Sequence, residues 1–142
     1  MLAHVGAPTA VRQLKLVGLD WLRQKDPKVP LGTASISAHL KSQGIEHQLR
    51  SFAVNDPGFR PDEVISWALD GLASRDGRDA CLCFGAFIWA EKELQYILQG
   101  IRDGGFRGTI ALGGPQVGDV LAAMVRLWGS VQLGVPSGVY LK

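Results

Sequence analysis

The chain contains 142 residues, of which 46% are hydrophobic and 20% are charged, and its formal net charge is +2. This length and composition are typical of one compact domain with a hydrophobic core. The small net charge, without a Lys/Arg cluster interleaved with aromatic residues, argues against nucleic acid as a partner. No apolar run reaches the length of about 18 residues that a membrane helix needs, and the first residues lack the features of a signal peptide. We therefore expect a cytoplasmic protein that does not span a membrane.

The composition changes little along the chain, so only its two ends are set apart from the expected domain. Residues 1–12 show no hydrophobic period and are expected to form a leader. The domain is expected over 13–134, without internal repeats or low-complexity segments. Residues 135–142 include Pro136 and Gly138 and are expected to form a tail.

The first predicted strand covers 13–20 and ends on an acidic residue. It is followed by a polar loop over 21–30, which is longer than the usual connection of about two to six residues. Long loops at the ends of strands are often functional. A helix is predicted over 31–43, because Pro30 and Gly44 are typical of its two ends. Its apolar stripe consists of Thr33, Ile36 and Leu40.

A second strand and a second helix are predicted next. Residues 45–52 carry more polar side chains, which indicates a strand nearer the edge of a sheet. The sequence NDPG at 55–58 is a strong turn signal. Pro61 is well suited to open the following helix. The apolar positions of this helix are Val64, Ile65, Ala68 and Leu72.

The unbroken apolar run ACLCF at 80–84 predicts a central strand that is covered on both faces. Cys81 and Cys83 are the two cysteines of the chain and would share one face of this strand. Their Cα atoms would lie about 6.6 Å apart, near the upper limit for a disulfide. Two thiols cannot complete a tetrahedral zinc site, and the histidines form no spaced set with them. We expect buried, unreactive thiols.

The last third of the chain repeats the alternation of helix and strand. The clearest helix of the chain is predicted over 91–103, and a brief strand over 108–112. A fourth helix is expected after Pro115, and a short fifth strand over 130–133. The inner residues of these two helices are Leu94, Ile97, Leu98 and Ile101, and then Val117, Val120, Leu121 and Met124.

Regular alternation of this kind predicts an α/β fold with a parallel sheet, right-handed crossovers and helices on both faces. With five strands, the expected arrangement is Rossmann-like of the flavodoxin type, with the strand order 2-1-3-4-5. Ligands of such sheets bind at the carboxyl ends of the strands, where the order reverses. Here that point lies between the first and third strands, so residues 20–22 should face residues 85–87 across one crevice.

Common nucleotide and hydrolase motifs are missing from the sequence. No G-x-G-x-x-G follows the first strand, and neither a phosphate loop of the G-x-x-x-x-G-K-[ST] type nor a G-x-S-x-G elbow occurs. A receiver domain has the same fold but needs an aspartate after the third strand, where this chain has glycine and alanine. The expected crevice is apolar and bordered by glycine, which suits a large, flat ligand better than a phosphate.

Three segments carry a resemblance to a known family. They are GAFIWA at 85–90, ALGGPQV at 111–117, and PLG at 30–32, which opens a helix ending in KSQG. In this order and spacing they resemble the cobalamin-binding domain at the N-terminus of cobalamin-dependent radical S-adenosylmethionine enzymes. The resemblance covers most of the chain, about 14–117.

The resemblance implies cobalamin as the cofactor and places it at the crevice. A corrin is a broad, mostly apolar ring, and a bed of glycine and alanine allows strand ends to approach it. Gly113 and Gly114 would leave room for the nucleotide tail, and the backbone N–H groups of 115–117 would lie at a helix start. No catalytic residue and no protein ligand to the metal are implied. The implied cofactor-binding residues are Asp20, Trp21, Leu22, Gly85, Ala86, Phe87, Ile88, Trp89, Gly113, Gly114, Pro115, Gln116 and Val117.

The chain departs from the family at several positions. Classical cobalamin modules carry D-x-H-x-x-G after the first strand, with the histidine bound to cobalt. Asp20 matches this motif, but Leu22 replaces the histidine and Lys25 the glycine. The resemblance therefore implies a base-off cofactor without a protein imidazole. Gly85 stands where related modules often have serine, and 133–142 lacks the family's glycine- and acid-rich segment.

The sequence also lacks the C-x-x-x-C-x-x-C motif that holds the iron–sulfur cluster of the radical enzymes. The resemblance therefore implies the cofactor-binding part of a larger or partner radical S-adenosylmethionine enzyme, of the methyltransferase or radical-rearrangement type. One alternative is a non-enzymatic interaction or sensor module that has lost cobalamin. Another is an enzyme for a different small ligand in the same crevice.

Several implied residues also have ordinary structural interpretations. Trp89 could contact the corrin or pack on the sheet at a helix start, and Trp21 could contact a ligand from its loop. Asp20 could orient the loop or merely end a strand. The two glycines at 113–114 could form only a turn.

Overall fold

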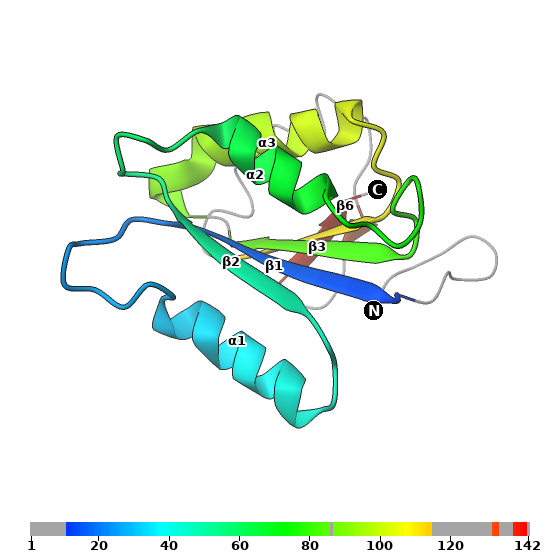
Figure 1. Cartoon of the computed structure of the whole chain (residues 1–142), viewed down its shortest axis with the longest axis horizontal. Coiled ribbons are helices and arrows are strands. Elements are labelled where there is room, and N and C mark those ends of the chain that lie inside the picture. The colour runs from blue at the N-terminus through cyan, green and yellow to red at the C-terminus, as the bar shows by residue number, and fades with distance from the viewer. Residues whose placement is uncertain (1–10, 86, 115–131, 134–137, 142) are drawn as a thin grey trace.

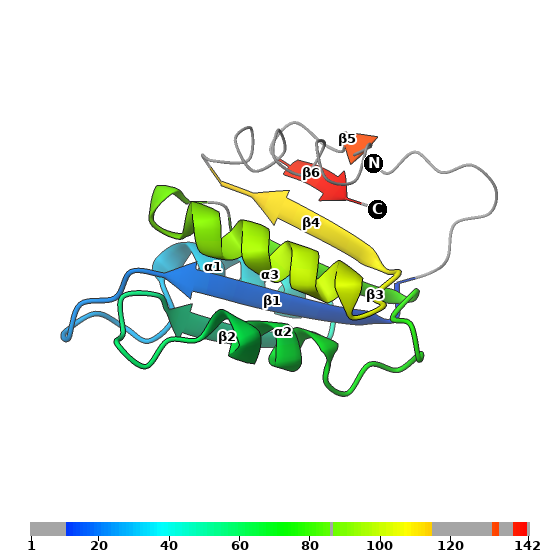
Figure 2. The same ribbon diagram turned by 90° about the horizontal axis from the view of Figure 1, so that it is seen from above.

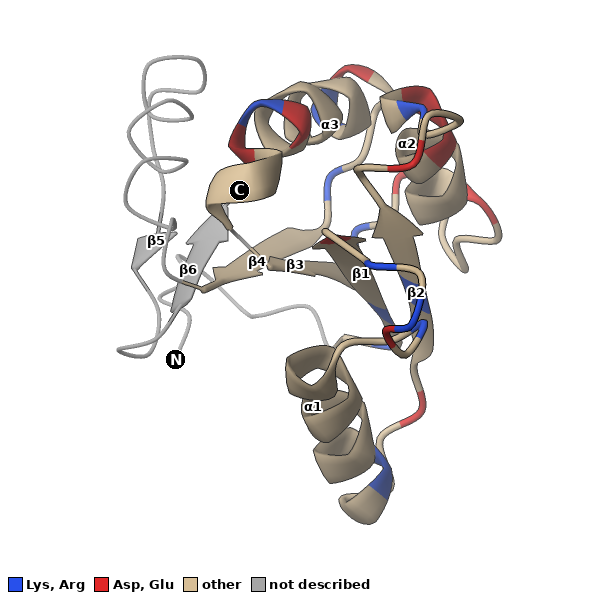
Figure 3. Cartoon of the chain, turned by 90° about the vertical axis from the view of Figure 1, so that its left-hand side faces the viewer, with Lys and Arg blue, Asp and Glu red and all other residues tan. Residues whose placement is uncertain are grey.

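A computed structural model describes residues 11–85, 87–114, 132–133 and 138–141 of the chain. Helices lie on both faces of a β-sheet: α1 covers one face, and α2 and α3 cover the other (Figure 1, Figure 3). The helices are α1 (Leu31–Ser42), α2 (Pro61–Leu69) and α3 (Glu91–Asp103), with a short 3₁₀ turn, η1 (Ile88–Ala90), before α3. The strands are β1 (Gln13–Asp20), β2 (Gln48–Ala53), β3 (Ala80–Gly85), β4 (Thr109–Gly113), β5 (Gln132–Leu133) and β6 (Gly138–Leu141).

The first four strands form a parallel sheet in the order β2-β1-β3-β4. This confirms the α/β fold of the flavodoxin type over these strands and places β3 between β1 and β4. The edge position of the polar strand β2 is confirmed as well. Each crossover places a helix between two parallel strands, as the alternating pattern predicts.

The far side of the sheet differs from the predicted order. The strand beside β4 is β6, which runs antiparallel to β4, and β5 pairs antiparallel with β6 (Figure 2). The prediction that a fifth parallel strand over 130–133 would lie next to β4 is therefore wrong. Part of the expected tail forms that neighbouring strand instead, because the open edge of β4 offers unpaired backbone groups to any extended segment that reaches it. The helix predicted after Pro115 lies outside the described residues.

The hydrophobic core lies between the sheet and the helices α2 and α3. Alternate residues of β1, β3 and β4 point into it, as the two-residue period of a strand requires. The four predicted inner residues of α3, namely Leu94, Ile97, Leu98 and Ile101, are all buried. Pro61 opens α2, as predicted. Within α2 the buried residues are Val64 and Ala68, whereas Leu72 lies beyond the helix end.

The opposite face of the sheet is covered more thinly. Helix α1 contains no buried residue, and the side chain of Ile36, expected on its apolar stripe, is 56% exposed. The sheet residues on this face include Gly18, Cys83 and Ala111, which are small. Among the helices that the structure describes, none is long and apolar enough to cross a membrane.

Candidate functional site

The predicted ligand site lies at the carboxyl ends of β1, β3 and β4. Gly85 at the end of β3 is paired with Gly113 at the end of β4. Two residues earlier, on the same face of the sheet, Cys83 is paired with Ala111. Two neighbouring strands therefore end without side chains at the same level. Gly114 continues this edge with a φ of 107°, in a backbone region that favours glycine.

Asp20 ends β1 with a buried carboxyl group. Its side chain is on the face opposite the core and accepts a hydrogen bond of 2.5 Å from the Ser51 hydroxyl on β2. Gly18 lies two residues before Asp20, and a Cβ at Gly18 would collide with the Asp20 carboxylate. The missing side chain at Gly18 therefore makes room for this carboxyl group. Burial raises the pKa of Asp20, and the hydrogen bond from Ser51 opposes that rise.

Two aromatic side chains bridge the ends of β1 and β3. The rings of Phe87 and Trp89 are stacked, with centroids 4.7 Å apart and planes 3° apart. The Trp89 Nε1–H donates a hydrogen bond of 3.0 Å to the backbone carbonyl of Leu19 on β1. A Cβ at Gly85 would lie 2.7 Å from the Phe87 ring, so this ring covers the end of β3. The segments that were expected to face each other across a crevice are thus connected by an aromatic pair.

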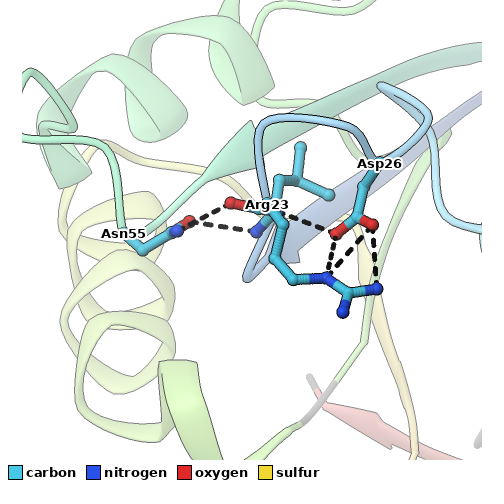
Figure 4. Close-up of polar contacts among 4 residues, drawn as sticks. Arg23, Asp26 and Asn55 are labelled. Carbon is cyan, nitrogen blue, oxygen red and sulfur yellow. Dashed lines mark hydrogen bonds and ion pairs between the residues drawn. The ribbon is translucent and has the colours of Figure 1, made fainter.

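The loop after β1 is fastened to the loop after β2 by one side chain. The Asn55 amide nitrogen donates to the carbonyl of Leu22 at 2.7 Å, and the Asn55 amide oxygen accepts from the N–H of Leu22 at 3.0 Å (Figure 4). This pair of bonds fixes the backbone at Leu22, the position at which classical cobalamin modules carry histidine. In the same loop, Arg23 and Asp26 form an exposed ion pair with an N–O distance of 3.1 Å. The hydrogen bonds from Arg23 lower the pKa of Asp26.

Asn55 is a site residue that the sequence analysis did not identify. The NDPG sequence predicted a turn here, and the turn is present. However, the side chain that takes part in the turn is that of the neighbouring Asp56, whose Oδ1 accepts a hydrogen bond of 2.8 Å from the N–H of Gly58. The side chain of Asn55 is therefore available to the loop after β1. An asparagine two residues after β2, the strand that pairs with β1, was the available signal, but it does not distinguish these two uses.

Exposed apolar side chains accompany the strand ends. The side chains of Trp21, Ile88 and Trp89 are 58%, 71% and 40% exposed. Trp21 follows β1, whereas Ile88 and Trp89 belong to the 3₁₀ turn after β3. Among the predicted site residues, the structure brings Asp20, Trp21, Leu22, Gly85, Phe87, Ile88, Trp89, Gly113 and Gly114 to this end of the sheet. The other predicted site residues, Ala86, Pro115, Gln116 and Val117, lie outside the described residues.

Two shallow hollows lie away from this edge. One, of about 580 Å³, is bordered by Arg75 and Gly105 near the amino ends of β3 and β4. The other, of about 490 Å³, is bordered by Arg50 and Asp62 beside α2. Neither includes a predicted site residue.

The strand ends suit a corrin in part. Gly113 and Gly114 present a backbone edge without side chains, and the exposed parts of Ile88 and Trp89 offer apolar surface to a flat ring. At the end of β3, however, the Phe87 ring occupies the space that the missing side chain of Gly85 leaves. Over the described ranges there is no group of three or more His, Cys, Asp or Glu that could hold a metal ion.

Comparisons of this chain with models of known protein families, with curated proteins and with solved structures found no match.

Proposed function

We propose that the chain binds cobalamin at the carboxyl edge of its parallel sheet, in a base-off form without a histidine ligand. The observation that carries the proposal is the pairing of Gly85 with Gly113. Gly113, together with Gly85 once the Phe87 ring moves off it, would allow a large ring or its side arms to approach the backbone closely. The order β2-β1-β3-β4 adds support, because ligands of such sheets bind beyond these strand ends.

The individual residues would have different roles toward the cofactor. Trp21, Ile88 and Trp89 would supply apolar contact with the corrin, and Gly113 and Gly114 would admit its nucleotide tail. Leu22, with its backbone held by Asn55, would exclude water beneath the ring. When bound, the cobalt supplies a carrier for a methyl group or an electron. The partner would be a radical S-adenosylmethionine domain or chain that performs methyl transfer or a radical reaction.

A second function, a non-enzymatic interaction or sensor module that does not bind cobalamin, is favoured by the aromatic pair. The Phe87 ring lies on Gly85, and Trp89 is tied to the backbone of β1. In this module the pair would close the switch point permanently. The same side chains that could support a corrin would then serve as packing.

The test compares cobalamin retention by three forms of the purified chain. Each is mixed with hydroxocobalamin, desalted and examined by visible spectroscopy. We expect the unmodified chain to retain a base-off spectrum, Gly113→Trp to lose it, and Ser35→Trp on the exposed side of α1 to retain it. Ser35→Trp is the matched control, because it adds the same side chain away from the strand ends.

A colourless unmodified chain would overturn the cobalamin proposal. Phe87→Ala then tests the second function, because this variant removes the ring that covers Gly85. Retention of cobalamin by Phe87→Ala alone would show that the aromatic pair closes the site in the natural sequence. Folding of each variant is checked by circular dichroism.

A further inference from the structure

Strand β2 is the last strand on its side of the sheet, and among the described residues no segment pairs with its outer edge (Figure 3). The N–H of Val54, just after this strand, donates to the carbonyl of Asp20 on β1. In a parallel pair the backbone groups of alternate residues face the neighbouring strand, so this bond fixes which residues of β2 face β1. The residues whose N–H and C=O groups face outward are Leu49, Ser51 and Ala53.

A hollow with an excess of negative charge lies beside this edge, on the α2 face of the sheet. Its volume is about 490 Å³, and its lining residues are Arg50, Asp62, Glu63, Ser66, Trp67 and Asp70. Within the described residues, neither Arg50 nor Glu63 forms an ion pair. Because three carboxylates and one guanidinium border the hollow, it suits a further cation. A guanidinium suits it best, since its planar group also stacks on an aromatic ring such as that of Trp67.

A second copy of the chain brings such a cation when the two β2 strands pair antiparallel. In a symmetric dimer, the two-fold axis passes through the middle outward-facing residue, Ser51. Leu49 then faces Ala53 of the second copy, and each such pair exchanges two backbone hydrogen bonds. In the same register, Arg50 lies opposite Phe52 of the second copy. Each Arg50 is thereby brought to the hollow of the other copy.

The side chains on the two faces of β2 are compatible with this register. Arg50 already lies on the α2 face, with its guanidinium carbon 4.4 Å from the centre of the Phe52 ring. Phe52 is nearer than Arg50 to the end of β2 where α2 begins, so Glu63 in the first turn of α2 is the acid that the incoming Arg50 meets. On the other face, Leu49 meets alanine and Ser51 meets serine. No like charges are therefore placed opposite each other.

We propose that the outer edge of β2 is a surface for self-association, and that its partner is the same edge of a second copy of this chain. The two sheets join into one continuous sheet through antiparallel β2 strands. Arg50 of each copy pairs with Glu63 of the other. The proposal is independent of cobalamin, because it uses the side edge of the sheet and not the carboxyl ends of β3 and β4.

The first test measures the mass of the full chain by sedimentation equilibrium between about 1 and 100 μM, a range suited to a small interface. We expect the natural chain to change from monomer to dimer with increasing concentration. Leu49→Pro removes an outward N–H, and an edge strand tolerates proline at such a position. This variant should weaken the dimer by at least about tenfold. Leu49→Ala is the matched control, because it shortens the same side chain but keeps the N–H, and it should still dimerise.

The second test reverses the charges that meet across the interface. Arg50→Glu and Glu63→Arg should each weaken their own dimer by at least about tenfold, because like charges then face each other. An equimolar mixture of these two variants should form a heterodimer, since both cross-interface pairs are then of opposite charge. Lys92→Glu on α3 is the control charge reversal away from β2 and should leave the dimer unchanged.

Three results would overturn the proposal. The first is a natural chain that stays monomeric over the whole concentration range. The second is equal dimerisation of Leu49→Pro and the natural chain, because the dimer would then use another surface. The third is a mixture of the two charge variants that associates no better than each variant alone. Circular dichroism confirms that each variant is folded before its result is used.

Discussion

The carboxyl group of Asp20 is the least expected feature at the scale of single residues. Its sequence position suggested either an orienting group for the following loop or a simple strand end. Instead it turns back over Gly18 and is held by Ser51, 5% exposed and without a cationic partner among the described contacts. A buried carboxylate in this setting is costly when ionised, because burial removes its hydration.

This environment predicts a specific dependence of stability on pH. Burial raises the pKa of Asp20 above its ordinary value of 3.8, so the folded chain holds the proton to a higher pH than the unfolded chain. The stability from this group is complete below the unfolded pKa and is lost as the pH rises through the folded pKa. Asp20→Asn has no proton to lose. Its free energy of unfolding, relative to the natural chain, should therefore rise across the pH range directly above 3.8.

Urea unfolding at several pH values between about 4 and 7 measures this difference. Ser51→Ala provides a second arm, because loss of the hydroxyl donor raises the pKa of Asp20 further. In that variant, the loss of stability that accompanies ionisation of Asp20 should occur at higher pH. A constant difference between Asp20→Asn and the natural chain over the whole range would contradict the prediction.

At the scale of elements, the periodic segments could be predicted and the contacts between loops could not. Helix α3 was predicted with its observed bounds, because four buried side chains on one stripe leave a strong pattern. The run ACLCF likewise predicted the central strand. The bonds from Asn55 to Leu22 join residues 33 positions apart and leave no local pattern. The bridge from Trp89 to Leu19 has the same character, since it depends on which strands become neighbours.

The role of Asn55 leads to a prediction about the loop after β1. Asn55→Ala removes both hydrogen bonds to the Leu22 backbone, so the 21–30 loop should open more often. Arg23, Lys25 and Lys28 make this loop a substrate for trypsin, and cleavage there should become faster. Global stability should fall by about 1 kcal/mol, because both hydrogen bonds are at a partly exposed position where water can replace them.

The measurement is a time course of tryptic digestion, with cleavage sites identified by mass spectrometry. Asn55→Asp is the conservative comparison, because a carboxylate can still accept from the Leu22 N–H but cannot donate to its carbonyl. Its cleavage rate should lie between those of the natural chain and Asn55→Ala. Equal rates for all three forms would show that the side chain does not hold the loop.

Lys15 performs a comparable task for helix α2. Its side chain is 2% exposed, and the Nζ donates hydrogen bonds of 2.6 Å to the carbonyls of Trp67 and Asp70 at the end of the helix. A positive charge there is also favoured by the helix dipole. Lys15→Met keeps much of the volume but leaves the two carbonyls without this donor.

We expect Lys15→Met to lower the free energy of unfolding by about 1–3 kcal/mol. Removal of a buried ammonium group offsets part of the loss, since burial lowers the pKa of Lys15. Lys41→Met on the exposed surface of α1 is the control and should change stability by less than about 0.5 kcal/mol. Urea unfolding of both variants measures the two changes. If the hydrogen bonds of Lys15 to the end of α2 did not contribute to stability, the loss at residue 15 would be no greater than the loss at residue 41.

At the scale of the whole molecule, the two faces of the sheet are unequal. Both carry a helix, as the alternating pattern predicted, but the core cluster lies on the side of α2 and α3. The sequence indicated this difference only through the weaker pattern of α1, whose expected stripe is Thr33, Ile36 and Leu40, whereas α3 carries four apolar residues at helical spacing. It also did not reveal β6, because a segment of four residues with a glycine has too little local pattern to identify a strand. The partner of that strand is set by the open edge of β4.

Because the two faces are unequal, the same substitution should change the free energy of unfolding by very different amounts on α3 and on α1. Ile97 of α3 is 0% exposed, whereas Ile36 of α1 is 56% exposed. Ile97→Ala creates a cavity in the core and should lower the free energy of unfolding by about 2–5 kcal/mol. Ile36→Ala should change it by less than about 0.5 kcal/mol.

Both substitutions replace isoleucine by alanine within a helix, so differences in helix propensity cancel. Urea unfolding under identical conditions measures the two values. A loss at residue 36 as large as that at residue 97 would mean that α1 is packed as tightly as α3, and that the core extends through the sheet to both faces.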